Sequence, residues 1–404
     1  MPPSDPAKTR DACPMPPEAV TSLWIVAGLA MAPAVAQGFG RFAYALVLPA
    51  MRDELGWSWA DAGAMGTANA IGYLIGAILA ATLARHFGAK RVFSASLAAA
   101  SVTIATAATA DGYWSQGALR LTAGLASGVA FVVGGALAAA AASGGGPARA
   151  PTALGVYVAG AGAGIALSAL AVPPIVAELG WRGGWIALGL LSALATIVAA
   201  PAIRRTPEPA LAAVGAGSGV SLRPILPAFL AYGLLGAGYI AYATFVIAYL
   251  KAELDFGPLE ISTFWCTLGV AIIVCTFLWG PVLGRLRGGL GLAATTTVMI
   301  AGVALVIVEP TRTGAYLSAA LFGASSLASV TAVTALARRI YPPQHWTAAI
   351  GLLTVAFGVG QIVGPVLSGF VSDGPNGLRA GLILSLWIMA ATLASALFQR
   401  ERRA

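Results

Sequence analysis

Arg41 is the residue of greatest chemical interest in this chain. It lies in the sequence GFGRFAYA (38–45), inside an apolar run that extends from about Leu23 to Met51. If that run is a membrane helix, Arg41 lies about nine residues, or roughly 14 Å, below the nearer membrane surface. An arginine side chain reaches about half that distance. We therefore expect Arg41 to face protein or a water-filled cavity and not lipid.

Other polar side chains inside apolar runs could line the same site. Gln37, Arg41 and Tyr44 recur at i, i+4 and i+7, which places them on one face of a helix. Arg120, in the sequence RLTAGLASG, is a second cation inside an apolar run. The remaining candidates are Asn69, Tyr73, Tyr239, Tyr242 and Gln361. For Asn69, Tyr73 and Gln361, hydrogen bonding between helices is the alternative interpretation.

The positions of the acidic residues determine how the two arginines are interpreted. All 15 Asp and Glu residues can be placed outside the apolar runs, so neither arginine has an acid partner within the membrane. Ionisable groups there are costly and mark candidate functional sites. A guanidinium group suits a carboxylate or a phosphate. We expect a small organic anion, most simply a carboxylate, as the ligand. The alternative for Arg120 is that it bonds backbone carbonyls at a helix break, and the alternative for Arg41 is a structural role.

Asp61 is a candidate proton carrier, but its sequence context favours a structural role. Ser58, Trp59, Ala60 and Asp61 have the S-x-x-D form of a capping box just before an apolar run. The same sequence therefore predicts that Asp61 caps the start of a helix.

Catalytic chemistry finds no support in the sequence. The two histidines, His86 and His345, lie in separate loops, and no metal-ligand cluster, phosphate-binding loop or nucleophile–base set is present. We expect neither an enzyme nor a protein that holds a cofactor or a metal.

The amino-acid composition indicates that most of the chain lies in a lipid membrane. Hydrophobic residues make up 58% of the chain and charged residues 9%, with a mean hydropathy of +0.85. Runs of about 20 apolar residues suit helical spans and are about twice as long as barrel strands need to be. The sequence predicts an all-α integral membrane protein with twelve transmembrane helices, at about 22–50, 61–84, 92–110, 116–142, 152–177, 183–203, 226–250, 260–283, 290–308, 314–337, 348–371 and 378–398.

The distribution of Lys and Arg predicts the orientation. With a cytoplasmic N-terminus, sixteen of the 23 basic residues fall on the inner side and five on the outer side, with Arg41 and Arg120 in the membrane. Both termini are therefore expected in the cytoplasm. The net charge of +8 is explained by this topology and calls for no nucleic acid partner.

The chain divides into two similar halves. We expect a disordered cytoplasmic tail (1–20), a six-helix bundle (21–203), a cytoplasmic linker (204–225), a second six-helix bundle (226–399) and a short cytoplasmic tail (400–404). GFGRFAYA (38–45) aligns with GAGYIAYA (236–243), with five identities in eight positions. Parallel six-helix repeats of this kind are a known construction of transporters.

These features resemble the major facilitator superfamily (MFS). Its loop motif after the second span appears as ATLARHFGAKR (81–91), with Arg85 where the family has Asp, and its fourth-span motif appears at Arg120 and Gly124. The GFGRFAY sequence is similar to a bacterial subfamily of unsettled substrate. The resemblance implies two pseudo-symmetric six-helix bundles, a cavity lined by spans one, four, seven and ten, and a location in the bacterial inner membrane.

The predicted function is secondary active transport of a small organic anion by alternating access, in a monomer within the lipid bilayer. The alternative is a proton-coupled exporter of neutral or cationic compounds, which would predict a membrane-embedded carboxylate; a receptor or a passive channel is a further alternative. Small residues around Gly76 in span two and Gly364 in span eleven recur every four positions. We expect these stripes to form the sliding interface between the halves, with static packing as the alternative.

Overall fold

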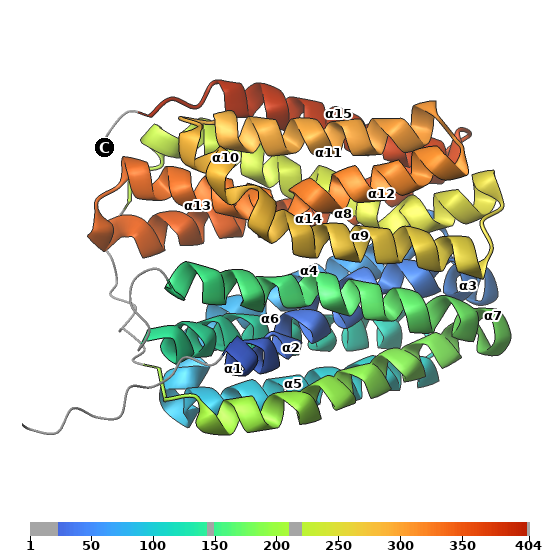
Figure 1. Ribbon diagram of the computed structural model, residues 1–404. Helices are drawn as coiled ribbons and strands as arrows, with labels where there is room; N and C mark the ends of the chain where they lie inside the picture. The colour runs from blue at the N-terminus through green and yellow to red at the C-terminus, as the bar shows by residue number, and fades with distance from the viewer. Residues whose placement is uncertain (1–22, 144–148, 210–219, 402–404) are drawn as a thin grey trace, which may run out of the picture.

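The long apolar runs of the sequence fold into helices that lie side by side (Figure 1). The computed structural model describes residues 23–143, 149–209 and 220–401. The expected tail 1–20, part of the linker (210–219) and residues 402–404 lie outside the described residues. Within the described part, no strand is present and 11 helices are long and apolar enough to cross a membrane. The predicted all-α membrane fold is confirmed.

The helices follow one another along the chain in a simple order. They are α1 (Leu23–Leu29), α2 (Met31–Pro33), η1 (Ala34–Phe42), α3 (Tyr44–Leu55), α4 (Trp59–Phe87), α5 (Ala89–Thr106), η2 (Ala107–Thr109), α6 (Tyr113–Ala142), α7 (Arg149–Arg205), η4 (Arg223–Ile225), α8 (Leu226–Leu254), α9 (Pro258–Leu278), α10 (Gly280–Arg285), α11 (Leu290–Val308), α12 (Arg312–Ser326), α13 (Ala328–Ile340), η5 (Pro343–His345), α14 (Trp346–Ser372) and α15 (Gly377–Leu397).

Helix α7 contains two membrane crossings. Its apolar part is 54 residues long, and Gly180 interrupts it with φ 66° and ψ −173°. Only glycine adopts this backbone conformation readily, because it has no Cβ. Figure 1 shows α7 turning back on itself at one end of the molecule. The 11 long helices therefore provide the twelve crossings that the sequence predicts.

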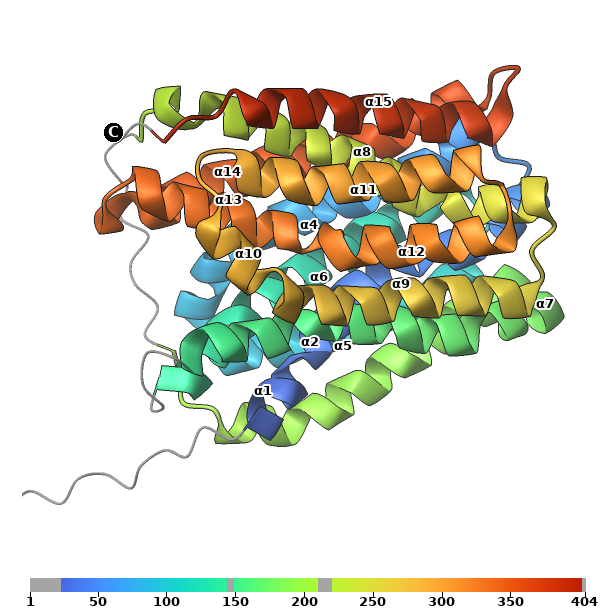
Figure 2. The ribbon, with the colours of Figure 1, turned by 45° about the horizontal axis from the view of Figure 1, so that its top comes forward.

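Helices α1–α7 and α8–α15 form two groups, with α1–α7 below α8–α15 in Figure 1; in the view of Figure 2 the second group lies in front of part of the first. The internal repeat is visible in how helices pack within each group. Gly124 of α6 lies against the carbonyl of Asn69 in α4, and Gly323 of α12 lies against the carbonyl of Leu268 in α9. Both residues of the second pair follow those of the first by 199 positions. A Cβ at either glycine would overlap the carbonyl, so both halves keep the same close contact.

The small-residue stripes do not form the interface between the halves, and that prediction was wrong. Gly76 of α4 lies against the backbone of Leu125 in α6, within the first half. Gly364 of α14 lies against the backbone of Ala237 in α8, within the second half. Spacing alone shows that a helix face can approach another closely but does not say which helix it approaches. Each stripe here holds together helices of a single half.

Different contacts join the two halves. Gly63 of α4 lies against the carbonyl of Pro365 in α14, and Thr67 Oγ1 donates a hydrogen bond of 2.6 Å to the carbonyl of Ile362. On the other side of the molecule, Gly162 of α7 meets Gly269 of α9, where a Cβ on Gly162 would lie 2.5 Å from the Gly269 carbonyl oxygen. The halves thus touch through glycine at two helix crossings.

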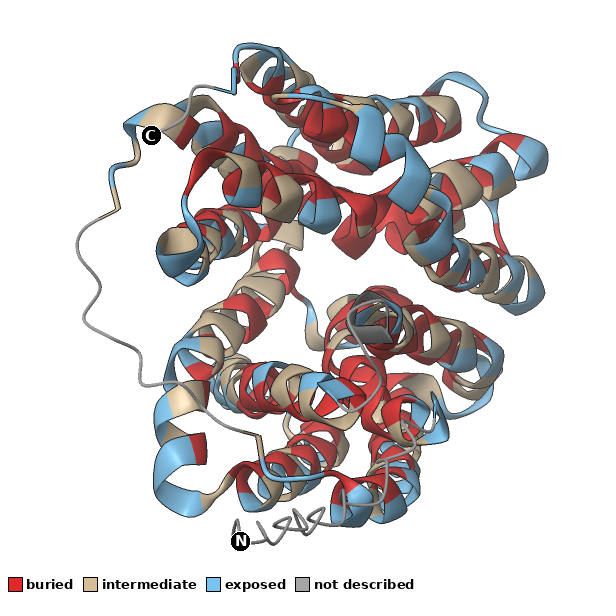
Figure 3. Cartoon of the chain, turned by 60° about the vertical axis from the view of Figure 1, so that its left-hand side comes forward, coloured by how far each residue is buried: buried red, intermediate tan, exposed pale blue. Residues whose placement is uncertain are grey.

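The pattern of buried and exposed residues fits a helix bundle surrounded by lipid. In Figure 3, buried residues gather on helix faces that turn toward other helices, and exposed residues lie on the outer faces. Many of the exposed side chains are large and apolar, among them Ile197, Phe370 and Trp387. Exposed apolar side chains in such numbers indicate a surface in contact with lipid.

We expect single cysteines to report the predicted topology. In a cysteine-free background, cysteine at Ser115 or Thr313 should react with a membrane-impermeant maleimide in intact cells, whereas cysteine at Ser143 or Ser221 should react only after permeabilisation. All four positions are exposed in the structure, so protection reflects the membrane and not burial. Labelling of Ser143 or Ser221 from outside would contradict the predicted cytoplasmic location of the termini.

Candidate substrate-binding site

The first membrane span changes its helical geometry at the predicted site. Residues Ala34–Phe42 form a π-helix, η1, and the Ala43 N–H donates to the Gly38 carbonyl five residues earlier at 2.9 Å. Such wide turns are rare and often occur at functional sites. Gly38 permits a close approach here, because a Cβ would lie 2.6 Å from the backbone of Gly164 in α7. Gln37 and Arg41 both lie on this π-helical segment.

Arg41 is buried between the two halves of the molecule. Its side chain is 7% exposed, and its Nη2 has no hydrogen-bond partner. The guanidinium carbon lies 5.4 Å from the ring centre of Tyr73 in α4, and Tyr239 of α8 packs against the next residue, Phe42, with ring centres 5.9 Å apart. Gln37 Nε2 donates to the Tyr73 hydroxyl at 3.0 Å. The structure therefore brings Gln37, Arg41, Tyr73 and Tyr239 together, and we call these four residues the Arg41 group.

Arg120 is held by protein atoms. It is 2% exposed, and its Nη1 donates to the Gly40 carbonyl in η1 at 2.8 Å. Its guanidinium carbon lies 4.6 Å from the ring centre of Tyr44 and 5.2 Å from that of Trp185. Both contacts are of the cation–π type. The structure matches the alternative in which Arg120 bonds a backbone carbonyl at a break in a regular helix.

The two arginines share one electrostatic environment. They lie close enough for their charges to repel each other. Among the described residues they are also the only charged side chains that are buried, so no described Asp or Glu compensates them. Water is largely excluded from both groups, and each keeps a donor without a partner, Nη2 of Arg41 and Nε of Arg120. The site carries uncompensated positive charge.

Several predicted residues are engaged elsewhere. The Tyr44 hydroxyl donates to the Ala62 carbonyl at 2.8 Å, and the Tyr242 hydroxyl lies 2.7 Å from Ser318 Oγ. Asn69 Nδ2 donates to the Arg120 carbonyl at 3.2 Å, so it joins two helices as its alternative interpretation held. Gln361 is buried in α14, with no hydrogen bond to Arg41 in the described structure.

Aromatic rings surround the Arg41 group more closely than the sequence suggested. Tyr239 stacks on Phe322 of α12, with ring centres 5.4 Å apart, and meets the edge of Phe42 at 5.9 Å. Trp185, which supports Arg120, stacks with Tyr44 at 6.2 Å. Phe42, Trp185 and Phe322 were missed as site residues. An aromatic residue in a membrane helix usually serves packing, and its sequence gives no sign that a cation lies over its face.

Asp61 adopts the capping role that its motif predicts. The Ser58 hydroxyl accepts from the Asp61 N–H at 3.0 Å, and the Asp61 carboxylate accepts from the Ser58 N–H at 3.1 Å. Both halves of a capping box are therefore present at the start of α4. No contact in the described structure links Asp61 to Arg41.

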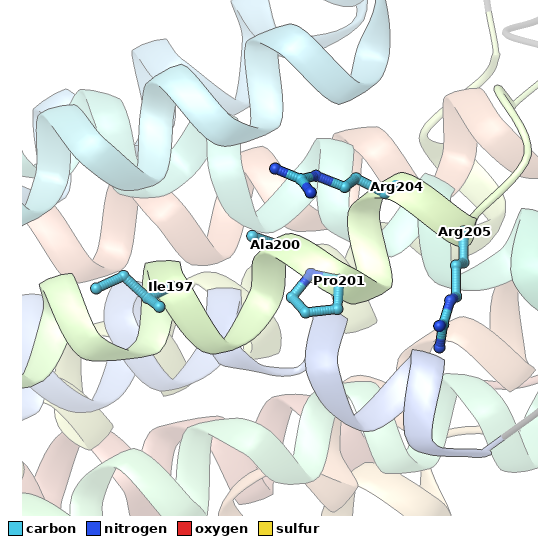
Figure 4. A pocket seen from close by; sticks show the side chains of 5 residues that line it. All are labelled: Ile197, Ala200, Pro201, Arg204 and Arg205. Carbon is cyan, nitrogen blue, oxygen red and sulfur yellow. The ribbon is translucent and has the colours of Figure 1, made fainter.

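Two surface grooves lie away from this site. One, of about 290 Å³, is lined by Ile197, Ala200, Pro201, Arg204 and Arg205 at the end of α7 (Figure 4). The other, of about 310 Å³, is lined by Arg223, Pro224, Pro227, Phe398, Gln399 and Arg400. Figure 4 shows the two arginines of the first groove extending in different directions. Neither groove includes a residue of the Arg41 group.

The structure has a twelve-crossing helical fold of two similar halves, and this is the fold of membrane transporters of the MFS type. The chain belongs to the family described as uncharacterised MFS-type transporter YbfB, whose model matches residues 33–398. It is therefore a multi-pass membrane transporter and not an enzyme.

Individual proteins are similar to the chain at different levels. A Haemophilus influenzae protein that carries the name of a metabolite transport protein is 33% identical over 147 residues, which is 36% of this chain and 35% of that protein. The chain thus matches about a third of this relative's length.

Solved structures extend the likeness to the whole fold. A bacterial homologue of the human lysosomal transporter Spinster, in an inward-facing and unoccupied conformation, has a TM-score of 0.68 at 14% identity and covers 93% of this chain and 96% of that one. The nucleoside transporter NupG has a TM-score of 0.69 at 15% identity over 94% and 97%. The human organic anion transporter MFSD10 has a TM-score of 0.65 at 15% identity over 95% and 100%. At these identities the likeness shows the fold alone.

Replacement of Asp61 should separate capping from proton coupling. Asp61→Asn removes the charged half of the box and should destabilise the protein by about 1 kcal/mol. The variant should leave the pH dependence of transport in proteoliposomes unchanged. Ser58→Ala removes the other half of the box and should lower the melting temperature to a similar extent. A pH dependence lost in Asp61→Asn but kept in Ser58→Ala would show that Asp61 carries protons.

Proposed function

We propose that the protein is a secondary active transporter that moves a small organic anion, most simply a carboxylate, across the bacterial inner membrane by alternating access. The observation that supports this most directly is the state of Arg41. Its Nη2 is buried without a hydrogen-bond partner, and no described acid is buried with it. A guanidinium group left in this state is suited to a ligand that brings the missing negative charge.

The physical argument rests on desolvation. A charged group that leaves water loses several kcal/mol of hydration free energy. It recovers this only through an opposite charge or good hydrogen bonds. The ring of Tyr73 recovers part of this cost for Arg41. An anion between Arg41 and the hydroxyls of Tyr73 and Tyr239 would recover more, because each hydroxyl can donate to it. Binding energy is thus available for an anion and not for a neutral or cationic ligand.

The other predicted residues take supporting roles in this proposal. Arg120 fixes the π-helical segment through Gly40 and adds to the local positive potential. Gln37 orients Tyr73 through its hydrogen bond. Tyr44 and Tyr242 already use their hydroxyls within the protein, and Asn69 links two helices. Gln361 remains a candidate lining residue on α14.

Alternating access requires contacts that join the halves on one side of the membrane at a time. Such a contact lies at the predicted outer end, where Asp373 follows α14. Its Oδ1 accepts from the Trp59 N–H at 2.7 Å and its Oδ2 from the Ala60 N–H at 3.0 Å. These N–H groups lie in the first turn of α4, where free donors and the helix dipole favour a carboxylate. We infer that Asp373 holds the outer side closed.

The second candidate function is proton-coupled export of neutral or cationic compounds. It would require a carboxylate within the membrane, and none of the described Asp or Glu residues is buried. Anion transport therefore accounts for the site better.

Substitution of Arg41 tests the anion site. Purified protein should be stabilised in a thermal-shift assay by at least one member of a panel of acetate, succinate, benzoate and phosphate. Arg41→Ala should weaken that anion's binding about tenfold or more, because hydrogen bonds to charged groups contribute about 1.5–3 kcal/mol. Arg41→Lys should bind less tightly than wild type, because lysine lacks the planar fork. Arg312→Ala, at an exposed arginine, is the matched control. Wild-type affinity in Arg41→Ala would show that Arg41 is structural.

Removal of the Asp373 carboxylate tests the outer contact. Spin labels at Ser115 and Thr313 report the distance between the outer ends of α6 and α12, which belong to different halves. Asp373→Ala should add a population with a longer distance, because two charge-assisted hydrogen bonds between the halves are lost. Glu178→Ala, at an exposed acidic residue of the same end, is the control. An unchanged distance distribution in Asp373→Ala would mean that other contacts hold this side closed.

A further inference from the structure

We propose that the anion bound by Arg41 is a monocarboxylate attached to an aromatic ring. This inference rests on the proposed function and deepens it, since it names the charge and the shape of the ligand. Two sets of observations support it: the different states of the two guanidinium groups, and the kind of side chains that surround Arg41.

The charge of the ligand follows from the different states of the two arginines. Arg120 is oriented by its hydrogen bond to the Gly40 carbonyl, and its guanidinium lies over the rings of Tyr44 and Trp185. Its Nε is buried without a partner, but the guanidinium group as a whole is anchored in place. Arg120 therefore acts as a fixed group that adds positive potential. Arg41 forms no hydrogen bond with a described residue and keeps a buried Nη2 without a partner, so it is the group free to close on a single carboxylate.

The shape of the ligand follows from the rings around Arg41. Tyr73 of α4 lies on one side of it and is followed by Phe131 of α6, with ring centres 6.1 Å apart. Tyr239 of α8, from the other half, is followed by Phe322 of α12 and by Phe357 of α14 at 6.0 Å. Aromatic rings from both halves thus lie around Arg41.

Such surroundings favour one class of acid over two others. An aromatic ring gains from stacked or edge-to-face contacts, which a saturated ring of the same size does not make. A second carboxylate would meet the electron-rich faces of these rings, and the one other described buried cation, Arg120, is already anchored to the Gly40 carbonyl. We therefore expect an aromatic monocarboxylate to bind more tightly than a saturated monocarboxylate or an aromatic dicarboxylate.

Tyr239 is the residue that we expect to set this preference. It contacts rings on three elements, Phe42 in η1, Phe322 in α12 and Phe357 in α14, and it comes from the half opposite to Arg41. Its ring therefore gives the second half a direct contact with the ligand's ring. Its hydroxyl forms no hydrogen bond with the described residues, so the ring and not the hydroxyl determines its packing.

Three probes separate ring character from charge. Benzoate and cyclohexanecarboxylate differ in aromaticity, and benzoate and terephthalate differ by one carboxylate. Titration calorimetry on the full-length protein in detergent should give an affinity for benzoate about tenfold above that for each of the others, the equivalent of two or three aromatic contacts. Tyr239→Leu should bring the affinities for benzoate and cyclohexanecarboxylate close together, whereas Tyr239→Phe should keep the difference.

The outcomes distinguish this inference from the proposed function. Equal affinities for the three acids, all lost in Arg41→Ala, would overturn the aromatic preference and leave an anion site at Arg41. A preference for terephthalate would overturn the single-charge argument in the same way. Benzoate binding that is unaffected by Arg41→Ala, or no binding of any of the three acids to folded wild-type protein, would overturn both the inference and the anion site.

Discussion

The structure depends on how it accommodates positive charge without an acid in the middle of a membrane protein. Arg41 and Arg120 are the only buried charged side chains among the described residues. The protein uses two substitutes for a counter-ion, a backbone carbonyl at Gly40 and the faces of aromatic rings. Both are weaker partners than a carboxylate, because they carry only partial charge. The remaining imbalance is concentrated at Arg41, between the two halves.

The π-helical segment of the first span and Arg120 support each other. Irregular backbone is tolerated at membrane depth only where protein covers it. Here Arg120 donates to the Gly40 carbonyl, and Gly38 lies against the backbone of Gly164. The carbonyl in return gives the guanidinium group a fixed orientation. Arg41 is the next residue after Gly40, so the contact that stabilises the segment also determines where the free guanidinium group lies.

The sequence predicted the elements better than their partners. The apolar runs and the capping box at Ser58 and Asp61 are local signals, and the structure has both the crossings and the box. Arg41 and Arg120 were found because a charge inside an apolar run has few explanations. The partners of Gly76 and Gly364 were assigned wrongly, since four-residue spacing defines a face but not the neighbouring helix. The contacts of Tyr44, Tyr242 and Trp185 depend on helix rotation, which periodicity leaves open.

The contact between Asp373 and the start of α4 depends on the amino-acid type of only one of its two partners. One partner is a side chain, and the other is a pair of backbone N–H groups at residues 59 and 60. Nearly any amino acid at those two positions supplies the same donors, proline excepted. Substitutions at residues 59 and 60 therefore leave the contact intact, and only the codon for Asp373 has to be kept. Methods that infer contacts from correlated substitutions between positions would not detect this connection between the halves.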